Sequence, residues 1–169
     1  EELKKSIRNL KKSKYSPSNK NKLTNFKTNI SLYESTNPIS KFNLKSKIDL
    51  LENINLYARN KSSNVREVSL SMNGNFQQVE ITKANGEFFC DLRPLVRMNI
   101  NITIEKKKKV ETGSYGFGGR HSYDQFFDKQ NWKRAVDSAY NQANIKLQAK
   151  AAPAGEQTVI LGPGWPGIL

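Results

Sequence analysis

The sequence predicts an α+β fold: a mostly antiparallel sheet of about five strands with helices packed on one face, preceded by an arm made of a helix and a linker. Three observations lead to this prediction. Apolar and polar residues alternate through much of residues 68–104, Asn-Gly pairs interrupt that block, and helical periodicity flanks it at residues 44–58 and 131–148. With 169 residues, the chain can bury one modest core.

The front of the chain predicts a helix followed by a linker. In residues 3–10, Leu and Ile recur every three or four positions among lysines, which is typical of the last turns of an amphipathic helix. Residues 17–27 are mostly Ser, Asn, Lys and Pro, a composition that favours a linker. A short extended stretch at 29–36 and a turn at Asn37-Pro38 complete the arm.

Two stretches have the apolar spacing of helices that cover a sheet. Asn43 or Ser46 can cap the first, and Asp128 or Asn131 can cap the second. The apolar face of the first consists of Leu44, Ile48, Leu51, Ile54 and Ala58, widened by Leu50 and Tyr57. The apolar stripe of the second consists of Trp132, Ala135, Val136, Ala139, Tyr140, Ala143 and Leu147.

Alternation of apolar and polar residues predicts the strands between these helices. Residues 68–72 form one, Asn73-Gly74 breaks the run, and residues 76–81 form the next. A tight turn at Asn85-Gly86 precedes residues 87–92. The strongest alternation comprises Val96, Met98, Ile100, Ile102 and Ile104.

After this strand, the four lysines 106–109 predict a charged turn, and residues 110–120 return as another strand. Near the end of the chain, Thr158 to Leu161 form a short apolar run that is typical of a buried strand. No internal repeat accompanies these elements.

The net charge of +13 raises the alternative of a basic nucleic-acid-binding module that uses the Lys-rich N-terminal part. Residues 1–61 carry +9 and residues 62–169 carry +4, so most of the excess lies in the front segment. Lysines outnumber arginines by 21 to 7, whereas base readout favours arginine. A solvated lysine surface is therefore the favoured interpretation. Affinity that falls steeply with salt would support the nucleic-acid alternative instead.

The lack of a membrane or signal segment and the single cysteine limit where we expect the chain to work and which kinds of site it can contain. No apolar run approaches the length of a membrane helix, and no signal segment opens the chain, so we expect a soluble, cytoplasmic piece without a membrane partner. The single cysteine, Cys90, excludes an internal disulfide and a Cys-rich zinc module. Beside Phe88 and Phe89, we expect it to be a small buried hydrophobic residue.

Few residues in the sequence suggest a catalytic, binding or metal site. The glycine cluster matches neither a P-loop nor a dinucleotide fingerprint, and it is interpreted either as a bulge or strand end or as a backbone that a ligand can approach closely. It comprises Gly113, Gly116, Gly118 and Gly119, followed by Arg120. His121 is the only histidine and is expected at the surface or in a hydrogen bond, so no metal site and no catalytic residue can be assigned. The carboxylates Glu105, Glu111, Asp124 and Asp128 are interpreted as surface charges.

Four segments together resemble the TldD branch of the TldD/TldE (PmbA) family of zinc metallopeptidases. In order, they are Asp91-Leu-Arg-Pro-Leu-Val-Arg97, Gly116-Phe-Gly-Gly-Arg120 with Tyr123 and Phe126-Phe127, Ala151-Ala-Pro-Ala-Gly155, and Val159-Ile-Leu-Gly-Pro-Gly-Trp-Pro-Gly167. The resemblance covers residues 46–169 well and the front mainly in layout. The family usually has glycine where Phe117 stands.

The resemblance implies a division into three parts. Residues 1–40 would be the end of the family's first domain and a linker, residues 41–150 the middle α+β domain, and residues 151–169 the start of the C-terminal catalytic domain. In the family, a zinc-binding His-Glu-x-x-x-His helix follows the Gly-Trp-Pro-Gly stretch. That motif is absent from this chain, so the resemblance implies a fragment that is inactive by itself, with zinc as cofactor of the parent only.

The resemblance also implies partners and a role. The parent would pair with a TldE/PmbA-like subunit or self-associate, and would hydrolyse peptides or unfolded proteins. This piece would be a scaffold and one wall of the cavity, with residues 113–120 as the strand along which a peptide substrate approaches. An autonomous peptide-binding domain is a further alternative.

Overall fold

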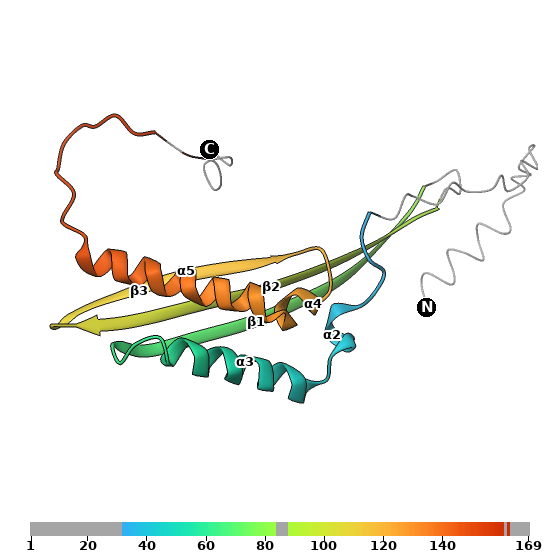
Figure 1. Cartoon of the computed structure of the whole chain (residues 1–169). Helices are drawn as coiled ribbons and strands as arrows, with labels where there is room; N and C mark the ends of the chain where they lie inside the picture. The colour runs from blue at the N-terminus through green and yellow to red at the C-terminus, as the bar shows by residue number, and fades with distance from the viewer. Residues whose placement is uncertain (1–31, 84–87, 161, 163–169) are drawn as a thin grey trace, which may run out of the picture. The chain divides into compact units, whose positions relative to one another are not determined.

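The structure is a computed structural model that describes residues 32–83, 88–160 and 162. Residues 33–77 and 93–160 belong to one compact unit, and the described residues of 78–92 belong to another. The elements, in chain order, are α2 (Pro38–Lys41), α3 (Leu44–Arg59), β1 (Val65–Thr82), β2 (Phe88–Lys106), β3 (Lys109–Gly119), α4 (Asp124–Phe127) and α5 (Lys129–Gln148) (Figure 1).

The described part is α+β, and its three strands form one sheet in the order β1-β2-β3. Strands β2 and β3 pair antiparallel, with Val96 opposite Gly119 and Ile104 opposite Glu111. Helix α5 runs along β3, and α3 runs along β1 (Figure 1).

The core lies between the sheet and these two helices. Alternate residues of β2 are almost completely buried, whereas Arg97 between them is exposed. The core comprises Val96, Met98, Ile100, Ile102 and Ile104 of β2, Leu50, Ile54 and Ala58 of α3, and Trp132, Ala135, Val136, Ala139 and Ala143 of α5, with Tyr123 and Phe126. Because the β2 residues in this core share one face of the strand, both helices cover that face, as the sequence predicted.

The two helices begin at capping residues that the sequence offered. The Asn43 side chain accepts a hydrogen bond from the Ser46 backbone N–H at 2.7 Å, and the Asp128 side chain accepts one from the Gln130 N–H at 2.9 Å. Asn37 caps α2 in the same way, with Pro38 in the first turn. The expected turn at Asn37-Pro38 is therefore the start of a short helix.

The prediction of about five strands is not confirmed, because the described residues form three long strands. Asn73-Gly74, expected as a break, lies inside β1. A β-carbon on Gly74 would lie 2.8 Å from Cζ of Tyr123, so this glycine makes room for a core tyrosine rather than a turn. The expected strands at 87–92 and 96–105 are likewise one strand, β2.

Two further predictions are wrong. Thr158 to Ile160, expected in a buried strand, are exposed and form no strand. Cys90 is exposed rather than buried, because it alternates with half-buried Phe89 and shares the exposed side of β2 with Phe88. The expected front helix, the linker, the Asn85-Gly86 turn and Leu161 lie outside the described residues.

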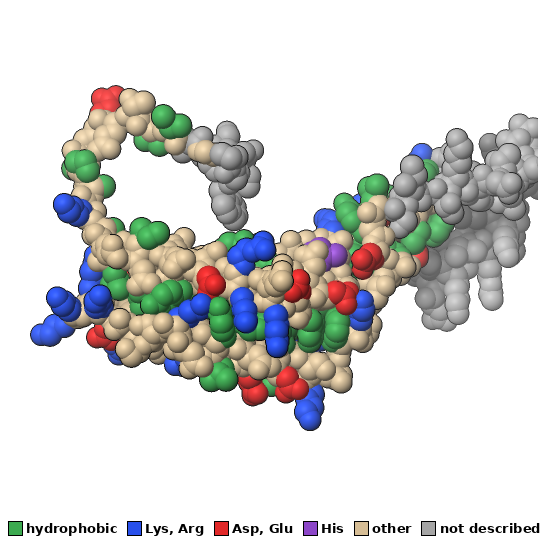
Figure 2. Space-filling view, viewed as in Figure 1, with side chains coloured by type: hydrophobic (Ala, Val, Ile, Leu, Met, Phe, Trp, Pro, Cys, Tyr) green, Lys and Arg blue, Asp and Glu red, His purple; other side chains and the backbone are tan. Residues whose placement is uncertain are grey.

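The lysine turn between β2 and β3 is confirmed. Lys107 and Lys108 both have positive φ, at 52° and 66°, which is the backbone of a tight two-residue hairpin turn. Figure 2 shows Lys and Arg side chains at this end of the sheet. In the described residues, no helix is both long and apolar enough to cross a membrane.

Candidate functional site

The glycine cluster lies on β3 and at its end, and β3 is an outer strand of the sheet. An outer strand has one row of backbone N–H and C=O groups that its neighbour does not use, and an extended peptide can pair with that row. The site therefore depends on which part of this edge other groups already occupy.

Side chains of α5 occupy the edge near Thr112 and Ser114. The Ser114 backbone N–H donates to Oε1 of Gln142 at 2.6 Å, and the Thr112 carbonyl accepts from Nζ of Lys146 at 2.6 Å. Gly113, between them, is buried. A β-carbon there would lie 2.6 Å from the backbone nitrogen of Ala143 and closer still to the Ala139 carbonyl, so glycine allows the helix backbone to contact the strand.

The edge near Gly116 and Gly118 is open by comparison. Backbone groups of alternate residues in a strand point to the same side. Because Thr112 and Ser114 direct theirs toward α5 and away from β2, Gly116 and Gly118 continue the same outward row. Both glycines are exposed, and among the described residues no α5 side chain bonds to either.

The remaining predicted site residues lie where β3 ends. Gly119 is half-buried against the ring of His121, and the Arg120 guanidinium lies 5.1 Å from the ring centre of Tyr33. Nδ1 of His121 lies 2.8 Å from the Ser122 carbonyl oxygen, so His121 is in a hydrogen bond as expected. The structure thus gathers Gly116, Gly118, Gly119 and Arg120 at one end of β3, whereas Gly113 lies under α5.

A small polar cluster holds the segment that follows. Asp124 forms an ion pair with Lys41 at 2.6 Å and accepts a hydrogen bond from the buried Ser122 hydroxyl. The Lys41 ammonium, and then the Ser122 hydroxyl, hold the pKa of the Asp124 carboxyl below its ordinary value. These contacts join α2 to the first residue of α4 and to Ser122 before it.

Two of the other carboxylates have structural partners. Glu105 pairs with Arg66, and Asp128 caps α5. Within residues 32–83, 88–160 and 162, no group of three or more His, Cys, Asp or Glu side chains could hold a metal ion. The described residues therefore do not fit a zinc site.

Sequence reasoning missed Gln142 and Lys146, the two side chains that cover half of the edge. Both lie on the exposed side of α5. The spacing of apolar residues identifies only the buried side of a helix, so it does not predict a role for exposed polar residues. The N-terminal segment behind the nucleic-acid alternative lies largely outside the described residues.

The class of protein follows from a family comparison. Residues 37–147 match the model of the PmbA/TldA metallopeptidase central domain. Since the match covers more than half of the chain, the chain belongs to the PmbA/TldD family of metallopeptidases.

Individual relatives agree with this assignment. The chain is 40% identical over 144 residues to a metalloprotease TldD homolog of Haemophilus influenzae, a match that covers 83% of this chain and 30% of the relative. It is 32% identical over 158 residues to a metalloprotease TldD homolog of Buchnera aphidicola subsp. Acyrthosiphon pisum, covering 90% and 33%. The chain thus spans about a third of the length of these relatives.

Proposed function

We propose that this chain is a non-catalytic part of a TldD-like metallopeptidase subunit, in which it serves as a scaffold and as a wall along which an extended peptide lies. The observation that carries the proposal is the half-covered edge of β3. Gln142 and Lys146 occupy the backbone groups at Thr112 and Ser114, whereas Gly116 and Gly118 stay exposed.

This edge suits a substrate of variable sequence. Main-chain hydrogen bonds to Gly116 and Gly118 would hold any extended peptide, because they do not depend on its side chains. The glycines add no side chain that would obstruct the approach. The covered part of the edge would end the pairing before Ser114, which limits how far along β3 a peptide can lie.

The parent subunit would supply the chemistry. In this proposal, the longer subunit would hydrolyse peptides or unfolded proteins in the cytoplasm, and zinc held outside the described residues would supply the activation of water. A PmbA-like subunit or a second copy of the parent would be its partner. Residues 41–150 would be the middle domain of that subunit, between residues 1–40 and residues 151–169 as parts of its neighbours.

The test compares this chain with the same chain inside the longer subunit, measured for bound zinc and for peptide hydrolysis. We expect the longer subunit, with its partner, to bind zinc and cleave, and this chain to do neither. Hydrolysis or stoichiometric zinc binding by the 169-residue chain itself would overturn the non-catalytic assignment.

A second measurement tests the wall itself. A labelled, extended peptide is titrated with the chain and followed by fluorescence anisotropy. The control peptide is N-methylated on alternate amides, which removes the donors that strand pairing needs. We expect the unmodified peptide to bind at least tenfold more tightly, about 1.4 kcal/mol. Equal affinity for the two peptides would contradict strand pairing.

A further inference from the structure

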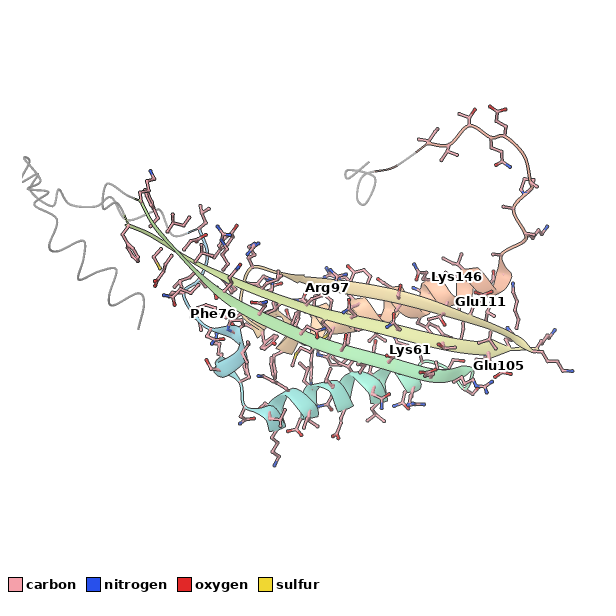
Figure 3. All side chains as sticks on the ribbon, turned by 180° about the vertical axis from the view of Figure 1, so that it is seen from behind. Lys61, Phe76, Arg97, Glu105, Glu111 and Lys146 are labelled. Carbon is pink, nitrogen blue, oxygen red and sulfur yellow. The ribbon has the colours of Figure 1, made fainter. Side chains whose placement is uncertain are left out.

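The face of the sheet away from α3 and α5 is polar. Between Val96 and Ile104, β2 presents on this face the residues that alternate with the buried core, namely Arg97, Asn99, Asn101 and Thr103. Gly116 and Gly118 lie on the same face of β3, because they are opposite Asn99 and Arg97 in the β2–β3 register. Arg97 is the cation among these residues, and Figure 3 labels it on the sheet.

Hydrogen bonds hold the Arg97 side chain over β3. Its Nε donates to Oδ1 of Asn99 at 2.9 Å, and Nδ2 of Asn99 donates to Oγ of Ser71 on β1 at 3.2 Å. A β-carbon on Gly116 would lie 2.5 Å from Nη2 of Arg97 and 2.8 Å from Oδ1 of Asn99. The guanidinium therefore lies across Gly116, in space that any other residue would fill.

The guanidinium has unused donors. The ion pairs between described residues use Lys41, Lys61 and Arg66, and none uses Arg97. Among the described residues, its hydrogen-bond partner is a neutral amide that Nε contacts, and the terminal nitrogens stay available to a ligand. A planar guanidinium that is already oriented matches the two oxygens of a carboxylate.

The position of this cation fits a ligand at the β3 edge. A peptide strand paired with β3 would lie about 4.8 Å from it, the ordinary spacing between strands. The Arg97 guanidinium lies over β3 at Gly116, so it is one strand spacing from such a peptide. The absence of a side chain at Gly116 leaves room for the guanidinium over the strand.

We propose that Arg97, oriented by Asn99 and Ser71 over Gly116, is a carboxylate-recognition site for an extended peptide at the open part of the β3 edge. This inference rests on the proposed function. The carboxylate has two sources, the free C-terminus of the peptide or an Asp or Glu side chain. In both cases, Arg97 binds and positions the peptide and takes no part in bond cleavage.

The experiment measures the affinity of the full chain for three labelled peptides of the same length. The first has a free C-terminal carboxylate, the second is its C-terminal amide, and the third is the amide with one Asp. They are titrated by fluorescence anisotropy at low salt against the wild type, Arg97→Gln and Arg97→Lys. The matched control is Arg134→Gln, which removes the same charge from an exposed position on α5.

The wild type and Arg134→Gln should bind at least one carboxylate peptide about tenfold more tightly than the plain amide, as a charge-assisted pair predicts. Preference for the free acid identifies the C-terminus as the source, and preference for the Asp peptide identifies a side chain. In Arg97→Gln the preference should fall below about twofold with unchanged affinity for the amide. Arg97→Lys should show an intermediate preference, because lysine keeps the positive charge but lacks the planar pair of N–H donors that a guanidinium offers.

Different outcomes would overturn the carboxylate site and the pairing of a peptide with the β3 edge. Equal wild-type affinity for all three peptides, or a preference that survives in Arg97→Gln, overturns the carboxylate site and leaves the edge function standing. If a carboxylate preference depends on Arg97 but persists in N-methylated versions of the peptides, the site stands and strand pairing fails. Absence of binding by any of the peptides contradicts both.

Discussion

The two halves of β3 differ in what happens to their outer edge. Around Gly113, helix α5 contacts the strand backbone, and Gln142 and Lys146 bond the outward groups of the neighbouring residues. Around Gly116, the outward row is exposed and a cation from β2 lies over the strand. Gly113 thus allows helix packing, whereas Gly116 makes room for the Arg97 guanidinium.

This difference shows that a glycine cluster need not have one cause. Gly113 is explained by the fold alone, because the neighbour of its missing side chain is rigid helix backbone. At Gly116 the neighbours are the ends of two side chains, those of Arg97 and Asn99. Only the second half of the cluster has the exposed backbone that a ligand needs.

The largest expected effect is on stability and separates the two glycines. Gly113→Ala should lower the free energy of unfolding by about 3 kcal/mol, because α5 must move off the strand. Gly116→Ala should cost less than about 1 kcal/mol, since only the ends of the Arg97 and Asn99 side chains have to shift. Urea denaturation of both variants measures this. Equal losses would mean that the two halves are packed alike.

An effect of intermediate size concerns the covered half. Gln142→Ala leaves the Ser114 N–H without its partner, and we expect a loss of about 1 kcal/mol for this exposed hydrogen bond. The control is Asn141→Ala, an exposed neighbour on α5, which should be close to neutral. Amide exchange at Ser114 should also become faster in Gln142→Ala only. Unchanged exchange there would show that Gln142 does not cover the edge.

The smallest expected effect is a pH dependence of stability that comes from Asp124, which follows the open half of β3 in the chain. The pKa of Asp124 is held below its ordinary value by Lys41 and then Ser122, so the unfolded chain takes up the proton first. This contribution to stability is present above about pH 4 and is lost as the pH falls through the folded-state pKa. Urea midpoints between about pH 6 and 3 should therefore fall less steeply in Asp124→Asn than in the wild type. Parallel curves would contradict the prediction.

Much of the fold could be predicted from the sequence because its signals are local. The alternation from Val96 to Ile104 and the caps Asn43 and Asp128 each depend on a few neighbouring residues. Gly74 shows where this reasoning fails. Its role depends on Tyr123, which is distant in the sequence and contacts it only in the folded chain.

The candidate site could be predicted only in part for the same reason. The glycines of β3 stand out in the sequence, but the coverage of Ser114 by Gln142 depends on how α5 lies on the strand. The Arg97 side chain is likewise oriented by Asn99, and it lies in the space that the missing side chain of Gly116 leaves on β3. Alternation placed Arg97 on the polar face and could not show that its guanidinium lies over Gly116.

The central claim is that an extended peptide pairs with the open half of β3 and not with the covered half. Amide hydrogen exchange, measured residue by residue by NMR with and without a saturating extended peptide, tests this most directly. The Gly116 and Gly118 amides should exchange rapidly in the free chain and at least tenfold more slowly with peptide, while Ser114 is protected in both states. Unchanged exchange at Gly116 and Gly118 with peptide bound would rule out strand pairing at this edge.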